Sequence, residues 1–308
     1  MRIFKNRGDI YIPKSGYKSS KEEQILLSLL GVVVVFTVAF VIIMGNRYDF
    51  SMKNFFASDK VIEEQQEIST TATLPAISGK SNYLVVETND KKDTVFYALL
   101  IQADRDNIAY KATILSPQTV IGTKSINQSF ADGGIQGLFA DMNNYFGFDI
   151  NYYAHFTTST FKDFVGDLGT FLYPSPESFK FSGGQGADEY SVRINEGEST
   201  INAKNFSNLL RYYVNEAKTY AIPNEIVLYA LVGLIDEESQ EDAQELFRTF
   251  IDDCSTNITV RDFASATDAM TVFTKSTDSI KVYSCVAQYD QNFTLTQESL
   301  KDIKGYFS

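Results

Sequence analysis

The segment Thr94–Ile101, Thr-Val-Phe-Tyr-Ala-Leu-Leu-Ile, indicates the class of fold, because it is apolar after its first residue and carries no charge. A continuous apolar run of this length is typical of an interior strand in a sheet that is covered on both faces. A similar run, Tyr83–Val86, precedes it, and another, Ile108–Leu115, follows it and ends at Ser116-Pro117. The centre of the domain is therefore predicted to be a sheet with helices packed on both sides.

Helical and strand-like segments alternate along the rest of the sequence. Apolar residues recur with helical spacing in segments 135–146, 160–168, 203–213, 225–236, 239–252 and 260–273. Short apolar runs predict further strands at 151–156, 191–194 and 280–287, whereas residues 174–188, rich in glycine, serine and proline, are expected to form a loop. Strands interleaved with helices predict an α/β domain at residues 81–308, layered α-β-α around a mixed central sheet.

Residues 25–45 are the candidate for a membrane anchor. The segment has 21 residues without a charge. A helix of that length, rising about 1.5 Å per residue, crosses a hydrocarbon layer about 30 Å thick. The alternative is a cleaved signal peptide, whose apolar part usually has about 7–15 residues and ends at a small-residue cleavage site. This segment is longer and ends in Ile-Ile-Met-Gly-Asn-Arg, so we expect one uncleaved transmembrane helix, a signal-anchor.

The charges beside this segment predict its orientation. Six basic residues precede it and Arg47 and Lys53 follow it, so residues 1–24 are expected to be a cytoplasmic tail and the rest of the chain to be extracytoplasmic at the cell membrane. Residues 46–80 are polar and weakly patterned, as in a stalk. Residues 1–45 carry six basic and three acidic side chains, a net charge of +3; since the whole chain carries −12, residues 46–308 carry −15. Such an acidic domain is a poor binder of nucleic acid.

Generic catalytic motifs are scarce in this sequence. The single histidine, His155, lies inside an expected strand, where packing is a more common role than catalysis. No group of histidines and cysteines has the spacing of a zinc site. Cys254 and Cys285 both fall in the expected extracytoplasmic part, where a disulfide between them and two buried free thiols are both compatible with the sequence.

Segments in a fixed order along residues 81–289 carry a family resemblance. They are Tyr83-Leu-Val-Val, Lys92-Asp93-Thr94-Val-Phe-Tyr-Ala-Leu, Thr113-Ile-Leu-Ser-Pro-Gln-Thr, Lys124-Ser-Ile-Asn-Gln-Ser-Phe-Ala-Asp-Gly-Gly, Phe146-Gly-Phe-Asp-Ile-Asn-Tyr-Tyr, Ile194-Asn-Glu-Gly-Glu-Ser-Thr-Ile-Asn-Ala, Asn224-Glu-Ile-Val-Leu-Tyr-Ala-Leu and Thr256-Asn-Ile-Thr-Val-Arg-Asp-Phe. Their order, their spacing and the membrane topology together resemble the LytR–CpsA–Psr family of bacterial cell-envelope proteins.

The resemblance implies an activity and its partners. The family is known for moving glycopolymers from a polyprenyl pyrophosphate carrier in the membrane onto peptidoglycan. A hydrophobic pocket takes the lipid, arginines hold the pyrophosphate, and carboxylates bind Mg²⁺ or Mn²⁺ and assist the acceptor hydroxyl. Guanidinium groups and a metal ion both suit this chemistry, since each neutralises a leaving pyrophosphate. The implied partners are the membrane, lipid-linked glycan, peptidoglycan and active members of the family.

The sequence departs from the family pattern at most of the anion-binding positions. Asp93 keeps the carboxylate position, but the arginine expected before it is Lys91 or Lys92. A Pro-Arg-Asp-Thr element is replaced by Pro117-Gln-Thr, and an arginine-rich helix motif is reduced to Arg211. Lysine does not equal arginine in bidentate binding of phosphate.

Three functions remain open: an active transferase with a rearranged site, a degenerate member that binds envelope lipid or glycan or scaffolds active relatives, and an unrelated exported interaction domain. In an active site, Asp93 would be the metal ligand or catalytic base, with Lys92 and Arg211 as phosphate partners. Otherwise Asp93 is a carboxylate at a turn and Arg211 a solvated helix residue. A helix face is the candidate lipid pocket, with plain core packing as the alternative; it consists of Ile135, Leu138, Phe139 and Met142.

Overall fold

The apolar runs of the sequence form the middle of a six-stranded mixed sheet. Strands β1 (Lys80–Thr88), β2 (Val95–Asp104) and β3 (Ala109–Leu115) pair antiparallel in that order. The sheet order is β11-β6-β1-β2-β3-β12, with β6 (Tyr152–Thr157) parallel to β1, β12 (Lys281–Ser284) parallel to β3, and β11 (Ser255–Thr256) antiparallel to β6. The predicted α/β class and mixed central sheet are confirmed.

The computed structural model describes residues 74–308. The predicted tail 1–24, the predicted transmembrane helix 25–45 and most of the predicted stalk 46–80 lie outside the described residues. Within residues 74–308, none of the helices has the length and apolar composition needed to cross a bilayer.

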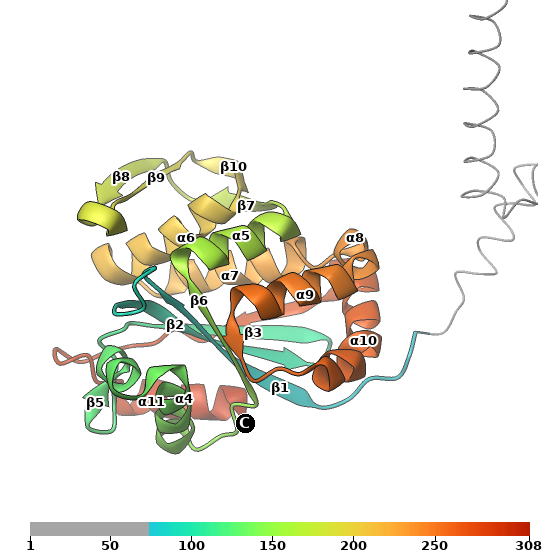
Figure 1. Cartoon of the computed structure of the whole chain (residues 1–308), viewed down its shortest axis with the longest axis horizontal. Helices are drawn as coiled ribbons and strands as arrows, with labels where there is room; N and C mark the ends of the chain where they lie inside the picture. The colour runs from blue at the N-terminus through green and yellow to red at the C-terminus, as the bar shows by residue number, and fades with distance from the viewer. Residues whose placement is uncertain (1–73) are drawn as a thin grey trace, which may run out of the picture. The chain divides into compact units, whose positions relative to one another are not determined.

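Helices cover both faces of the sheet (Figure 1). One face carries α4 (Ile126–Phe146) and α11 (Gln297–Phe307). The other face carries α5 (Thr158–Leu168), α6 (Ala203–Arg211), α7 (Ala221–Gly233), α8 (Glu237–Glu241), α9 (Ala243–Asp253) and α10 (Val260–Lys275). A π-helical turn, Tyr212–Glu216, follows α6, and two 3-10 turns are formed by Gly186–Asp188 and Thr277–Ser279.

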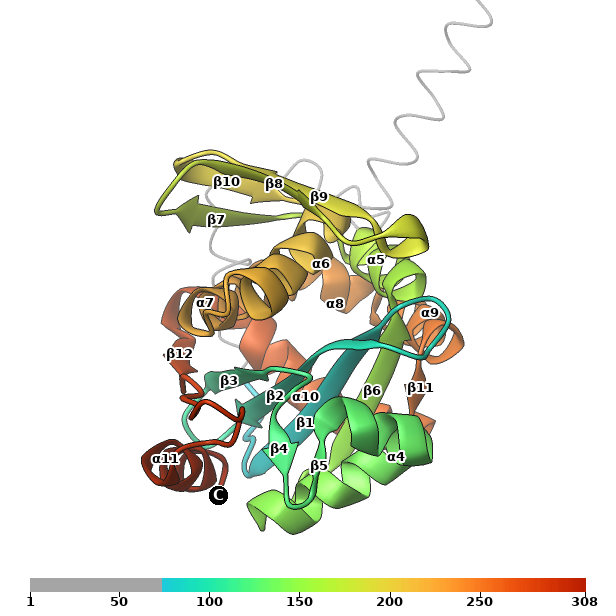
Figure 2. The same ribbon diagram turned by 90° about the vertical axis from the view of Figure 1, so that its left-hand side faces the viewer.

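Three small two-stranded sheets complete the fold. Strand β7 (Phe171–Ser175) pairs with β10 (Gly197–Ile201), β8 (Phe179–Gly183) with β9 (Tyr190–Ile194), and β4 (Val120–Ile121) with β5 (Lys124–Ser125). Figure 2 shows β7 to β10 lying outside the layer of α5, α6 and α7. The segment 174–188 is therefore not the plain loop that its composition predicted, because it contains the end of β7 and all of β8.

The alternation of side chains along the strands divides the core into two layers. Leu84 and Val86 of β1 are fully buried against α4 and α11, because side chains two apart in a strand point to the same face. Tyr97 and Leu99 of β2 belong to the other layer, beneath α5, α6 and α7. Both faces are therefore apolar, which explains why the strand runs are continuous.

Helix α4 is longer than its predicted apolar part and is interrupted. It begins at Ile126, where the Ser125 side chain caps it by accepting a hydrogen bond from the Gln128 amide. Gly134 has φ 61° and ψ −161°, a conformation that favours glycine, so the helix runs in two parts. The apolar spacing seen in the sequence starts just after this interruption.

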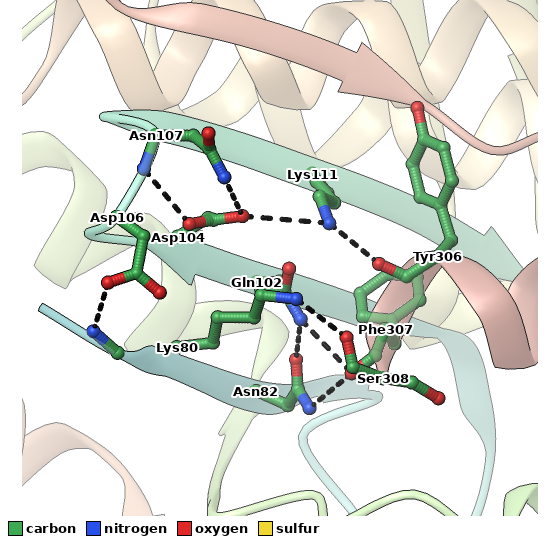
Figure 3. A network of polar contacts seen from close by, with 11 residues as sticks. Lys80, Asn82, Gln102, Asp104, Asp106, Asn107, Lys111, Tyr306, Phe307 and Ser308 are labelled. Atoms are coloured by element: carbon green, nitrogen blue, oxygen red, sulfur yellow. Dashed lines mark hydrogen bonds and ion pairs between the residues drawn. The ribbon is translucent and has the colours of Figure 1, made fainter.

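A polar network fixes the end of α11 to the sheet (Figure 3). The amide of Asn82 donates to the carbonyl of Phe307 (3.0 Å), and Gln102 Nε2 donates to the same carbonyl (3.1 Å) and to Asn82 Oδ1 (2.8 Å). Lys111 Nζ donates to the Tyr306 carbonyl at 2.8 Å. The last helix, which the sequence analysis missed, is thus held by buried amides of β1 and β2.

The two cysteines are free thiols, Cys254 half-buried and Cys285 buried. Cys254 directly precedes β11 and Cys285 directly follows β12, and these strands are the opposite edges of the sheet. Neighbouring strands lie about 4.8 Å apart, so the two edges are separated by roughly 24 Å, far beyond the reach of a disulfide. Of the two alternatives left open by the sequence, the structure has the free thiols.

Candidate functional site

The loop between β1 and β2 holds the predicted carboxylate, Asp93. Its Oδ1 accepts hydrogen bonds from Asn89 Nδ2 (2.6 Å) and from the Thr94 hydroxyl (2.9 Å). These bonds, that of Asn89 first, lower the pKa of the exposed Asp93 carboxyl below its usual value. Lys92 is also exposed and has φ 60°, in the left-handed region. The carboxylate is therefore ionised but tied to its own loop.

The side-chain amide of Asn89 lies between Asp93 and a second carboxylate. Asn89 Nδ2 lies 2.6 Å from Asp93 Oδ1 and 3.4 Å from Asp188 Oδ2, so a hydrogen-bond donor joins the two carboxylates. Mg²⁺ requires oxygen ligands in octahedral geometry. Within residues 74–308, no group of three or more histidine, cysteine, aspartate or glutamate side chains could hold a metal ion. A Mg²⁺ or Mn²⁺ ion beside Asp93 would need an oxygen ligand where the Asn89 Nδ2 donor now lies.

Arg211, the other predicted phosphate partner, is almost completely buried, with 5% of its surface exposed. Its guanidinium lies between two aromatic rings, 3.7 Å from the centroid of Phe96 and 4.3 Å from that of Tyr190. Nη2 donates to the Asp188 carbonyl at 2.9 Å, while Nε is buried without a hydrogen-bond partner among the described residues. The expectation of a solvated helix residue is wrong, and both faces of the guanidinium are covered.

Asp188 connects the predicted residues. Its carboxylate contacts Asn89, which holds Asp93, and its backbone carbonyl holds Arg211. Asp93 and Arg211 therefore belong to one neighbourhood formed by the β1–β2 loop, the β8–β9 loop and the end of α6. Within residues 74–308, no ion pair joins Lys92 to a carboxylate.

Glu87, a residue that the sequence analysis did not single out, lies beneath this neighbourhood. Its fully buried carboxyl group accepts hydrogen bonds from the hydroxyls of Tyr97 (2.6 Å), Ser207 (2.7 Å) and Thr158 (2.9 Å). Burial raises the pKa of Glu87, and these bonds and the Arg211 charge oppose that rise. The signal available in the sequence was a glutamate at the end of an apolar strand run.

His155 has a packing role. It is 7% exposed, its Nε2 lies 3.0 Å from the Thr88 hydroxyl, and its ring meets the edge of Phe130 at a centroid distance of 5.0 Å. Burial, with a smaller contribution from Lys92, lowers the pKa of His155 to about 4. The ring is therefore neutral at pH 7.

An apolar cavity of about 490 Å³ lies between the sheet and helices α5 to α10. This volume falls in the usual range of small-molecule sites, about 300–1,000 Å³. Aromatic and aliphatic side chains line it, Phe161, Phe206, Phe250 and Phe273 among them. Among the described residues that line it, the charged ones are Arg105 and Asp262.

The predicted lipid-pocket residues are on the other face of the sheet. Ile135, Leu138 and Met142 are buried in the core layer of α4, and Leu138 and Met142 are fully inaccessible. Phe139 is half-buried and packs against the ring of Tyr153 at a centroid distance of 5.2 Å. None of the four lines the cavity. An apolar helix stripe identifies the side that faces a sheet, but it does not indicate which side of the sheet is hollow.

Solved structures with the same fold share little sequence with this chain. A protein from Eubacterium siraeum DSM 15702, described as a candidate transcription regulator, is 18% identical, with a TM-score of 0.62 over 77% of this chain and 95% of its own. TagV from B. subtilis is 17% identical (TM-score 0.56, 75% and 96%), and TagT bound to LI-WTA is 14% identical (TM-score 0.53, 74% and 89%).

Sequence comparison identifies the family. No curated protein matches the sequence. The model of the LytR_cpsA_psr family matches residues 79–304, which is nearly the whole described domain. The chain therefore belongs to the LytR_cpsA_psr family, that is, LytR–CpsA–Psr.

Proposed function

We propose that this chain is a membrane-anchored, extracytoplasmic protein of cell-envelope assembly that binds a polyprenyl-phosphate-linked glycopolymer and does not itself transfer it. The apolar cavity is the observation that carries this proposal, because it offers about 490 Å³ of space with an almost entirely apolar lining. Membership of the LytR–CpsA–Psr family and the fold shared with TagT bound to LI-WTA support a glycopolymer ligand.

The lining of the cavity favours a hydrocarbon chain over a polar ligand. Burial of apolar surface contributes about 25 cal/mol per Å², so a prenyl chain gains affinity along its whole length. A sugar or nucleotide in the same space would leave its hydroxyl groups without hydrogen-bond partners, at a cost of about 1–3 kcal/mol for each group. We therefore assign the lipid part of the ligand to the cavity.

The absence of transfer is inferred from the residues around Asp93. Its carboxylate is joined to Asp188 by the amide of Asn89, and the guanidinium of Arg211 is enclosed by two rings. The loss of one preorganised donor to a developing charge typically reduces the rate by about 10²–10³. Lys92 alone would leave most of the negative charge of the leaving pyrophosphate without a cationic partner.

The charge of the chain argues against binding of nucleic acid. The net charge is −12, and binding to a phosphate backbone depends on lysine and arginine side chains that replace its counterions. The described domain thus lacks the electrostatic character expected of a DNA-binding regulator.

The test is a transfer assay in vitro with full-length protein, a lipid pyrophosphate donor, a peptidoglycan acceptor and Mg²⁺ or Mn²⁺. We expect no turnover, together with measurable binding of the lipid. Asp93→Ala is the matched variant, since Asp93 is exposed and its replacement should leave the fold intact. Robust turnover by the native sequence that Asp93→Ala abolishes would establish the active transferase instead.

A further inference from the structure

Strands β7 to β10 form one long hairpin, residues 171–201, which we call the ribbon. β8 pairs antiparallel with β9 and β7 with β10, in the order of a single continuous hairpin. Where the two pairs meet, the Glu196 amide donates a hydrogen bond to the Ser178 hydroxyl at 2.6 Å. The turn at the far end of the ribbon, residues 184–189, contains the 3-10 turn Gly186–Asp188, and we call it the tip.

The stem of the ribbon is fixed to the core, whereas the tip is held by few bonds. Tyr190 and Val192 of β9 are buried in the core layer of α6. Among the described residues, two hydrogen bonds join the tip to the rest of the domain, and both end on Asp188. Arg211 Nη2 donates to its carbonyl at 2.9 Å and Asn89 Nδ2 to its Oδ2 at 3.4 Å, on the side of the molecule where the β1–β2 loop lies (Figure 2). The tip can therefore open while the stem stays folded.

The guanidinium beneath the tip is held ready for a ligand at its edge. The rings of Phe96 and Tyr190 cover both of its faces, so Arg211 can make hydrogen bonds only in its own plane. There it meets the Asp188 carbonyl, while its Nε and the Tyr190 hydroxyl are buried without a partner among the described residues. Buried donors without a partner are unfavourable, so the closed arrangement leaves Arg211 incompletely satisfied.

An anion would satisfy this edge better than the tip does. A backbone carbonyl carries only a partial charge, whereas a phosphate-type anion adds the attraction between two full charges and can accept two parallel hydrogen bonds from a guanidinium. Asp188 also brings a carboxylate to the Asn89 amide beside Asp93. With the tip closed, one residue of the chain thus fills the positions that the oxygens of an anion would take.

We propose that the tip of the ribbon is a lid over an anion site at the edge of Arg211, with Asp188 occupying that site when the lid is closed. Opening frees Arg211 Nη2 and removes the Asp188 carboxylate from the neighbourhood, and a phosphate-type anion then holds the lid open by binding in its place. This inference goes beyond the proposed function, because it holds whether or not the apolar cavity contains a lipid.

Two glycines of the ribbon offer a matched pair of substitutions. Gly184 has φ 80°, and a methyl group there would clash with the Asp188 carbonyl oxygen, the atom that accepts from Arg211. Gly197, at the other end of the ribbon, has φ 87°, and nothing lies within 4 Å of a methyl group there. Alanine strains the backbone at both positions, but only Gly184→Ala acts on the closed tip.

The experiment measures how fast phenylglyoxal modifies each arginine of full-length protein in phosphatidylcholine nanodiscs, by mass spectrometry of peptides. In the native chain Arg211 should react about tenfold more slowly than the exposed Arg261, because it reacts only when the tip opens. Gly184→Ala should speed the reaction of Arg211 by about tenfold and Gly197→Ala should not change it. In Gly184→Ala, inorganic pyrophosphate should protect Arg211 but not Arg261, when compared with sodium chloride at equal ionic strength.

Asp188→Ala tests the lid without straining a glycine. It removes the carboxylate contact with Asn89 and should speed the reaction of Arg211 by about threefold, since one hydrogen bond is lost. Circular dichroism identifies any variant that has not folded. Native Arg211 that reacts as fast as Arg261, or Arg211 that stays protected in both folded tip variants, would overturn the lid. Arg211 that reacts fast in Gly184→Ala without protection by pyrophosphate would overturn the anion site.

Discussion

At Glu87 a carboxyl group lies inside the core, between β1, β2, α5 and α6, and its pKa is raised chiefly by burial. The hydroxyls of Tyr97, Thr158 and Ser207 and the charge of Arg211 face it. A carboxyl whose pKa is raised by folding binds its proton more tightly in the native state. Its favourable contribution to stability is therefore complete below the unfolded pKa of about 4.5 and is lost as the pH rises through the folded pKa.

Glu87→Gln tests this account, because glutamine keeps the shape and cannot ionise. As the pH increases above about 4.5, the native chain should lose stability relative to Glu87→Gln, by about 1.4 kcal/mol for each unit by which folding raises the pKa. Urea unfolding of both proteins, followed by circular dichroism between pH 4.5 and 8, measures the difference. A difference that stays constant over this range would show that Glu87 has an ordinary pKa.

The cysteines provide a second test at the scale of single residues. Because Cys254 and Cys285 lie at opposite edges of the sheet, we expect two titratable thiols per chain in protein that is unfolded without reductant. Ellman's reagent in guanidinium chloride gives the count. A value of zero, with a mass two units below that of the reduced chain, would contradict the sheet order.

Single residues also show what the sequence could not reveal. Asp93 was identifiable because it lies in a recognisable segment, whereas Glu87, Asn89 and Asp188 acquire their roles from strands and loops that the fold brings together. Arg211 was expected to be solvated because arginine usually is, but two aromatic rings enclose it. Such contacts depend on tertiary packing and leave no periodic signal in the chain.

At the scale of elements, a substitution in α4 can distinguish an effect on core packing from an effect on ligand binding. Leu138→Ala removes a fully buried side chain from the α4 layer and should reduce the free energy of unfolding by about 2–5 kcal/mol. Since Leu138 does not line the cavity, the affinity for geranylgeraniol should not change. Unfolding and binding measurements on the same variant check both statements. A large loss of affinity in protein that remains folded would show that the lipid binds at α4, as the sequence predicted.

The sequence predicted a helix or strand correctly where burial alone determines its pattern of apolar residues. Strands β1, β2 and β3 are covered on both faces, so continuous apolar runs identified them. The strand β8 was missed because glycine, serine and proline around it read as a loop; its place depends on Phe179 and Phe181, which pack against Tyr212 at centroid distances of 4.8 Å. The helix expected at 239–252 is divided into α8 and α9.

At the scale of the whole molecule, the charges around residues 25–45 predict which part of the chain is exported. Protease added to intact cells should digest the chain beyond residue 46 and spare the tail, because six basic residues precede the apolar segment and Arg47 and Lys53 follow it. Immunoblots with tags at either end follow both parts. A C-terminal tag that is protected in intact cells and digested after lysis would reverse the orientation.

If the cavity holds a prenyl lipid, full-length protein should retain that lipid when it is purified from membranes. Two variants on α10 form a matched pair: Ala269→Trp fills the cavity, whereas Ala264→Trp adds the same side chain to the exposed face. Mass spectrometry of extracts should find polyprenyl phosphate with the native chain and with Ala264→Trp, and at least tenfold less with folded Ala269→Trp. Polyprenyl lipid absent from the native chain, or retained equally by Ala269→Trp, would contradict the claim.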